Sequence, residues 1–188
     1  DGWKYAHYTG FGHTGLRAGA GNDRIILSGG SGESKSGNTL YTQESWSHNY
    51  RSRIQGDQGD DFIQLGGNAR YGDVFGGDGN DKIDASKASH VNRIFGDSGK
   101  DSIIGSAAND HIWGGLDNDS INAADGNNQV RGEAGNDAIT TGSGNDSIWG
   151  GTENDTVVSG DGDDALYGEA GDDNLNAGSG RDTVQGGA

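Results

Sequence analysis

The chain of 188 residues contains no cysteine, no proline and no methionine, and it has few apolar residues. Without cysteine, disulfide bonds cannot stabilise the fold. Apolar residues make up 29% of the chain, below the roughly 45–50% of an ordinary domain in a count that includes glycine. There are 38 glycines, and glycine loses more backbone freedom on folding than any other residue. We therefore expect something other than hydrophobic burial to hold the fold together.

Other absences narrow the function. No stretch approaches the ~20 apolar residues of a membrane helix. The sequence has no H-E-x-x-H, no G-x-S-x-G and no cysteine nucleophile, so we expect no enzyme; a catalytic carboxylate pair within 28–55 is the alternative. The net charge of -16 argues against binding nucleic acid or an anionic membrane. The charge is uneven, with 11 acidic and 10 basic residues in 1–95 but 18 and 3 in 96–188.

The dominant feature is a nine-residue repeat. Ten units follow one another from residue 96 to 185, beginning GDSGKDSII. Position six is aspartate in every unit except one, which has Asn128, and position eight is always isoleucine, valine or leucine. The unit also occurs at 18–26, 56–64 and 76–84. These units start at residues 18, 56 and 76, and the tandem run starts at 96. Each interval between successive starts is a multiple of eighteen plus two. This spacing predicts coils of two units each, with one side lengthened by two residues upstream.

Each unit predicts a glycine-rich turn followed by a short strand in which position eight points inward. Stacked coils then form two parallel sheets around a thin aliphatic core. One apolar column is Ile63, Ile83, Ile103, Ile121, Ile139, Val157 and Leu175; the other is Ile54, Val74, Ile94, Ile112, Val130, Ile148, Leu166 and Val184. We expect one continuous all-β solenoid, with an N-terminal cap at 1–17, irregular coils at 18–95 and regular coils at 96–188.

The aspartates of position six also form two columns. The first is Asp23, Asp61, Asp81, Asp101, Asp119, Asp137, Asp155 and Asp173; the second is Asp110, Asn128, Asp146, Asp164 and Asp182. Two carboxylates ~5 Å apart repel by about 3 kcal/mol at an effective dielectric constant of ~20, so such columns require counter-ions. Ca²⁺ fits, because it accepts carboxylate and backbone carbonyl oxygens in flexible geometry. Zn²⁺ and Cu²⁺ prefer histidine or cysteine.

The unit GGDGNDKID at 76–84 matches G-G-x-G-x-D-x-U-x at every fixed position, and the chain thereby resembles the repeats-in-toxin (RTX) family. The resemblance implies a right-handed parallel β-roll, secretion from bacteria, and Ca²⁺ ions bound between stacked turns by position-six carboxylates and backbone carbonyls. It assigns ligands at Asp61, Asp81, Asp101, Asp110, Asp119, Asp137, Asp146, Asp155, Asp164, Asp173 and Asp182. Without Ca²⁺ we expect the acidic repeats to repel and remain disordered.

Departures from the pattern carry expectations of their own. Asn128 should weaken the sites that flank it. The first glycine is replaced at Ala123, Thr141, Ser159 and Ala177, which we expect to be tolerated. Segments 65–75 and 85–95 lack the motif, so no such ions are expected on that side upstream of about Gly105.

Position nine of the second column forms an outer stripe: Phe75, Phe95, Trp113, Arg131, Trp149 and Tyr167. It is either a strip that binds sugar or a protein partner, or a shield over the core edge, and we favour the shield. Alternatives to a purely calcium-binding module are a polysaccharide-binding module resembling those accessory to alginate epimerases, an ice-binding segment, and the calcium-binding tail of a secreted lipase, protease or toxin. The polar segment 28–55 is a loop, a cap variant or a binding insertion. The chain ends in mid-repeat, so a truncation or a missing cap is expected there.

Overall fold

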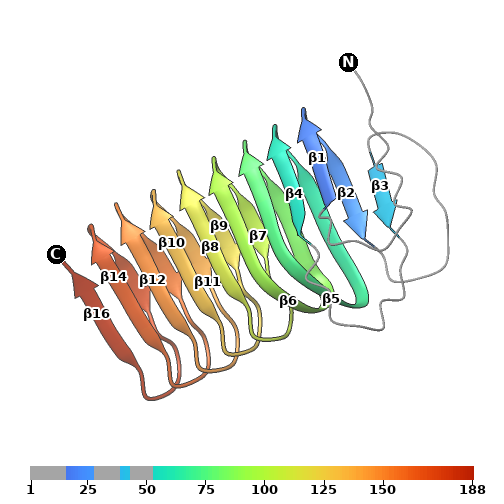
Figure 1. Ribbon diagram of the computed structural model, residues 1–188. Helices are drawn as coiled ribbons and strands as arrows, with labels where there is room; N and C mark the ends of the chain where they lie inside the picture. Colours follow the sequence, from blue (N-terminus) through green and yellow to red (C-terminus); the bar gives the residue numbers. More distant parts are fainter. Residues whose placement is uncertain (1–15, 28–38, 43–52) are drawn as a thin grey trace.

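The structure is a computed structural model that describes residues 16–27, 39–42 and 53–188. In these residues the chain winds into a solenoid of parallel strands stacked from the N-terminal to the C-terminal end (Figure 1). Two long strands, β5 (Phe62–Asp78) and β6 (Lys82–Ser98), run through both faces of the solenoid, and the other strands belong to one face each. No helix long and apolar enough to cross a membrane occurs within the described ranges.

The remaining strands divide between two faces. The first face contains β2 (Arg24–Leu27), β3 (Thr39–Thr42), β7 (Ser102–Ile104), β9 (Ser120–Asn122), β11 (Ala138–Thr140), β13 (Thr156–Val158) and β15 (Asn174–Asn176). The second face contains β1 (Leu16–Ala20), β4 (Ile54–Gln58), β8 (His111–Leu116), β10 (Gln129–Ala134), β12 (Ser147–Thr152), β14 (Ala165–Ala170) and β16 (Thr183–Gly187).

The predicted register is confirmed along both faces. On the first face Ile63 pairs with Ile83, and the partners continue in the predicted order to Leu175. On the second face Ile54 pairs with Val74, and the order continues to Val184. Nearly all of these side chains are buried, and Val184 in the last strand, β16, is 51% exposed. The aliphatic columns therefore fix which turns stack on which.

One prediction about spacing is wrong. The long interval between the units at 18–26 and 56–64 suggests two coils, but β1 pairs directly with β4 and β2 with β5. The interval is therefore a single coil with a long insertion. Its length equals that of two coils with a small extension, so the number of residues alone does not distinguish the two arrangements. Part of the insertion is β3, which pairs with β2 so that Leu40 lies opposite Ile25.

The predicted N-terminal cap lies mostly outside the described residues, but its last two residues, Leu16 and Arg17, belong to β1. The solenoid therefore begins slightly earlier than predicted. Most of segment 28–55 also lies outside the described ranges; within it, Thr39–Thr42, Ile54 and Gln55 lie in strands. The alternatives for the rest of that segment, a catalytic carboxylate pair or a binding insertion, fall on residues outside the described ranges.

The two lengthened coils differ from the others on one side. Here β5 and β6 bend through residues 65–73 and 85–93 as continuous paired strands with two register shifts. Leu65, Ala85, Ala88 and Val91 are buried in these bends. Apolar side chains therefore occupy the interior where later coils have carboxylate-bearing turns.

Candidate metal sites

Two rows of turns border the two faces. The first edge consists of turns that lead from the second face to the first: 18–23, 56–61, 76–81, 96–101, 114–119, 132–137, 150–155 and 168–173. The second edge consists of the turns that lead back: 105–110, 123–128, 141–146, 159–164 and 177–182. The turns stack so closely that some positions exclude a side chain. Gly77 has φ +119, and a Cβ built on it would overlap the backbone oxygen of Asp57.

Along both edges, the position-six side chains form hydrogen-bonded ladders. The backbone N–H of Asp61 donates to Oδ1 of Asp81 at 2.7 Å, and the same bond joins each position-six residue to the next coil at 2.6 to 3.0 Å. The first ladder joins Asp23, Asp61, Asp81, Asp101, Asp119, Asp137, Asp155 and Asp173. The second joins Asp110, Asn128, Asp146, Asp164 and Asp182. Both predicted columns therefore exist as structural features, and Asp23 begins the first.

The second oxygen of most of these carboxylates has no partner. Oδ2 is buried and accepts no hydrogen bond in Asp61, Asp81, Asp101, Asp119, Asp137, Asp146, Asp155, Asp164 and Asp173. A buried carboxylate oxygen without a partner is costly, and native proteins compensate for such groups with a hydrogen-bond donor or a cation. The repetition of one unpartnered atom along the stack therefore marks a row of candidate cation sites.

On the first edge, the unpartnered oxygen faces a second oxygen across a small space above the position-one glycine. A Cβ built on Gly56 would lie less than 3.0 Å from both Oδ2 of Asp61 and the backbone oxygen of Gly76. The same pair of atoms surrounds Gly76, Gly96, Gly114, Gly132, Gly150 and Gly168. Only glycine leaves this space open. Two oxygens from neighbouring coils therefore converge at one point. This arrangement suits Ca²⁺, whose ligands are oxygens at ~2.3–2.6 Å.

Burial in this column disfavours the charged form of the carboxylates. It raises the pKa of Asp61 and Asp101 to about 7 and that of Asp119 to about 8, although backbone hydrogen bonds to these carboxylates act in the opposite direction. Neighbouring aspartates raise these pKa values further. A cation would remove this penalty, because it compensates the buried negative charge directly.

The composition of a site is limited by the side chains available. Nowhere in the described residues do three or more histidine, aspartate or glutamate side chains gather in a group that could hold a metal ion. A Ca²⁺ ion can complete its coordination with backbone carbonyls and water, so it suits turns in which carboxylates and carbonyls converge.

Comparison with known protein families also points to calcium. The family model of the RTX calcium-binding nonapeptide repeat (4 copies) matches residues 49–69, 73–87, 89–121, 114–148, 122–157 and 149–184. The chain belongs to this RTX family. The matches cover most of the solenoid, so the chain is a β-roll of calcium-binding repeats. A comparison with curated proteins found no match.

Asn128 shows what an RTX turn does when its position-six side chain carries its own donor. Its Nδ2 donates to the backbone oxygens of Ala124 and Gly126, each at 3.2 Å. These carbonyls belong to positions two and four of the same turn. In the amide, Nδ2 replaces the Oδ2 that stays unpartnered in the aspartates, so a donor group sits where the aspartate turns lack one.

The sequence interpretation missed a set of acidic residues at position two of the first edge. No two successive coils carry a side chain there: the series reads Asp57, Gly77, Asp97, Gly115, Glu133, Gly151, Glu169 and Gly187. Every residue in this series has a positive φ. The acidic residues of this edge, including Asp117 and Glu153 at position four, have φ values of 71° to 79°. Such a conformation costs about 1–3 kcal/mol for residues other than glycine. The signal was available in the sequence as a repeat that is two coils long.

The upstream half of the predicted stripe is a stack of rings on the second face. The ring centres of Phe75 and Phe95 are 4.7 Å apart, and those of Phe95 and Trp113 are 4.6 Å apart, with near-parallel planes in both pairs. The guanidinium carbon of Arg53 lies 4.1 Å from the centre of the Phe75 ring. The rings therefore cover one another's faces along the solenoid axis.

The downstream half continues in the same way. Arg131 lies 4.2 Å from the centre of the Trp149 ring, and Trp149 stacks on Tyr167 with ring centres 5.6 Å apart. A sugar ring binds to an aromatic side chain through the open face of that ring. Because these contacts occupy ring faces, they favour the interpretation of the stripe as a shield of the core edge.

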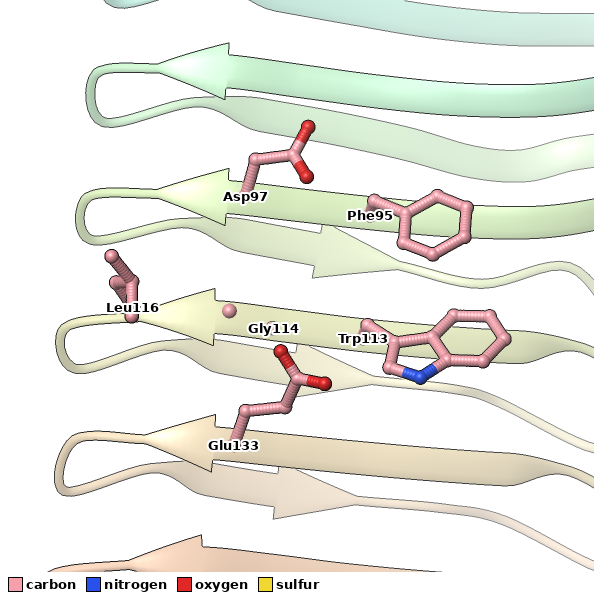
Figure 2. Close-up of a pocket in the computed structure, with 7 residues that line it drawn as sticks. Phe95, Asp97, Trp113, Gly114, Leu116 and Glu133 are labelled. Carbon is pink, nitrogen blue, oxygen red and sulfur yellow. The ribbon is translucent and has the colours of Figure 1, made fainter.

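Beside the stripe, a hollow opens on the second face over β8. Its lining includes Phe95, Asp97, Trp113, Leu116 and Glu133 around a floor of two glycines. Figure 2 shows the carboxylate of Glu133 directed toward the strand that contains Gly114, while that of Asp97 points away from it. Leu116 is 56% exposed. The hollow exists because position two is glycine in this coil and acidic in both neighbours.

Proposed function

We propose that this calcium-binding β-roll is a non-catalytic module of a secreted bacterial protein and that it folds when Ca²⁺ binds between its coils. The observation that carries the proposal is the row of buried, unpartnered Oδ2 atoms on the first edge, each facing a carbonyl of the next coil. When bound, Ca²⁺ would supply the positive charge that these oxygens lack. The residues proposed to hold it there are Asp61, Asp81, Asp101, Asp119, Asp137, Asp155 and Asp173, with Asp23 at the upstream end.

Coupling of binding to folding follows from the shortage of other stabilising contacts. Most strands contribute a single aliphatic side chain to the core. Most first-edge carboxylates are buried next to other carboxylates. A site that forms only when two coils come together has its binding free energy added to the free energy of folding. Since extracellular calcium modules bind at ~10⁻⁴–10⁻³ M, the chain would remain unfolded where Ca²⁺ is scarce and fold after export.

A calcium titration tests the proposal. Far-ultraviolet circular dichroism of the chain in excess chelator should show little β-structure, and addition of millimolar Ca²⁺ should produce it, while equal Mg²⁺ should not because Mg²⁺ requires stricter octahedral geometry. Calorimetry on the same samples should show uptake of several ions. A chain that is fully folded in chelator, or one that takes up no Ca²⁺, contradicts the proposal.

Polysaccharide binding is the second candidate, and its case is weaker than the composition of the stripe suggests. The stripe residues stack on one another, so a glycan would have to bind their edges. Retention of alginate on immobilised protein, lost in Trp113→Ala/Trp149→Ala but kept in a Leu116→Ala control, would support it.

A further inference from the structure

The two edges of the roll differ at position one. On the first edge this residue is glycine in each turn from 56 to 173, and the space above it lies open between two oxygens. On the second edge only Gly105 keeps glycine; the other position-one residues are Ala123, Thr141, Ser159 and Ala177. The sequence alone suggests that these replacements are tolerated. The structure shows that they put side-chain atoms into the space that glycine leaves open.

Two of these side chains donate to the backbone oxygen of the position-one residue in the next coil. Oγ1 of Thr141 donates to the backbone oxygen of Ser159 at 2.7 Å, and Oγ of Ser159 donates to that of Ala177 at 2.8 Å. Both side chains are buried. On the first edge the equivalent carbonyl, such as that of Gly150, faces the open space above Gly132 together with Oδ2 of Asp137. On the second edge a hydroxyl group thus occupies one of the two oxygens that a cation would otherwise bind.

The preceding turns of the second edge contain other internal donors. In the turn 105–110, the backbone N–H of Ser106 donates to Oδ2 of Asp110 at 2.7 Å, and its hydroxyl contacts both carboxylate oxygens. In the turn 123–128, the amide of Asn128 binds two carbonyls of its own turn. Every second-edge turn from 105 to 164 therefore has a donor of its own. The donors at Thr141 and Ser159 bind carbonyls, so Oδ2 of Asp146 and of Asp164 still accepts no hydrogen bond.

The two edges also differ in charge, because the first edge has acidic side chains at two turn positions where the second edge has none. All the acidic residues at positions two and four from residue 56 onward lie on the first edge, whereas these positions on the second edge contain only serine, alanine and glycine. Several of them raise the pKa of first-edge carboxylates, as Asp117 does for Asp119 and Glu153 does for Asp155. A higher count of negative ligands and neighbours increases the affinity of a site for Ca²⁺.

We propose that the two edges form two classes of calcium site, in which the first edge fills at low free Ca²⁺ and the second edge fills later and more weakly because its own hydroxyl and amide donors compete with the ion. This inference rests on the proposed calcium-dependent function. It makes Ser106, Asn128, Thr141 and Ser159 the residues that set the difference in affinity.

The test is a binding isotherm of the intact chain with Ca²⁺ as the probe. The wild-type chain should show two classes of site whose dissociation constants differ by at least about tenfold. The triple variant Asn128→Asp/Thr141→Gly/Ser159→Gly removes the donors of three second-edge turns and gives two of them the position-one glycine of the first edge. It should shift ions from the weak class to the tight class. The control Thr140→Gly/Thr156→Gly makes the same kind of change at exposed strand positions and should leave both classes as they are.

The converse variant is Gly132→Ser, which introduces a hydroxyl into an open space of the first edge at a residue whose φ is not positive. It should remove at least one ion from the tight class while circular dichroism at saturating Ca²⁺ still shows the β-roll. A single class of site in the wild type, or a tight class unchanged by Gly132→Ser, overturns the inference. No uptake of Ca²⁺ by the wild type at all contradicts the proposed function instead, so the two failures are distinguishable.

Discussion

The first edge of the roll is built in one way from residue 56 to residue 173, whereas the second edge changes its construction along the chain. In the first edge each turn leaves a buried carboxylate oxygen facing a carbonyl of the next coil. The second edge begins with bends filled by Leu65, Ala85 and Val91 and continues with turns that contain Ser106 or Asn128. The comparison shows that one backbone shape can be stabilised by apolar packing or by internal donors. The first-edge turns have neither, whereas the second edge has both along part of its length and keeps a buried, unpartnered Oδ2 only at Asp146 and Asp164.

The largest effect should come from the apolar part of the second edge. Leu65→Ala removes a fully buried side chain from the bend of β5, and we expect it to lower the free energy of unfolding of the calcium-loaded protein by about 2–5 kcal/mol. The number of bound ions should not change, because the bend contains no position-six carboxylate. Leu116→Ala is the control, since this leucine is 56% exposed, and it should cost less than about 0.5 kcal/mol. Loss of ions in Leu65→Ala would show that calcium binding at the first edge depends on packing in the bend of β5, and would contradict the comparison.

A matched pair of aspartates compares the edges directly. Oδ1 of Asp119 on the first edge and Oδ1 of Asp164 on the second each accept one backbone N–H at 2.8 Å, and both side chains are buried. Chemical denaturation at saturating Ca²⁺ should give a loss of about 3 kcal/mol for Asp119→Ala and about half of that for Asp164→Ala. Equal losses would contradict a difference between the edges.

The pKa values of the first edge predict how the calcium-free chain responds to pH. Asp61 and Asp101 have pKa values of about 7 and Asp119 of about 8 in the folded chain, against ~3.9 for an unfolded aspartate. The folded chain therefore binds more protons than the unfolded chain between about pH 4 and pH 8, and its stability rises as the pH falls through this window. Circular dichroism in chelator should show more β-structure at pH 5 than at pH 8. The opposite trend would mean that these carboxylates are not buried without Ca²⁺.

The smallest expected effect concerns position five of the first edge, where asparagine and aspartate side chains also form a ladder. Oδ1 of Asn80 accepts the backbone N–H of Lys100, and Oδ1 of Asn118 accepts that of Asn136. The ammonium group of Lys100 accepts no hydrogen bond, so it cannot continue the ladder to Asn118. Lys100→Asn should raise the melting temperature slightly, by a gain of about 0.5–1.5 kcal/mol, and tighten calcium binding. Lys100→Gln, whose longer side chain reaches a different position, should not.

Much of the fold follows from the sequence because the repeat determines the register. Position eight is aliphatic in every unit, so the partners of Ile63 and Ile54 are predictable along the whole stack, including segments such as 70–75 that lack the motif. The topology of the insertion after β2 was not predictable, since an added coil and an added loop have similar lengths. Position-six aspartates are likewise identifiable, but the sequence does not show which of their oxygens lack a partner.

The difference between the edges could have been noticed only in part. The replacement of glycine at Thr141 and Ser159 is visible in the sequence, yet their effect depends on where each hydroxyl points. The aromatic stripe was predicted from its spacing, whereas the stacking of Phe95 on Trp113 depends on side-chain rotamers. Properties that depend on the strand period were therefore predictable, and properties that depend on side-chain torsions were not.

The alternation of glycine and acidic residues at position two limits how the length of this protein can change in evolution. Loss of a single coil, for example 114–131, would stack Glu133 directly on Asp97, an arrangement found nowhere in this row. Loss or duplication of two adjacent coils together would preserve the alternation. The pair of coils is thus the unit by which this roll can be shortened or extended, and variants changed by two coils should fold more stably than variants changed by one.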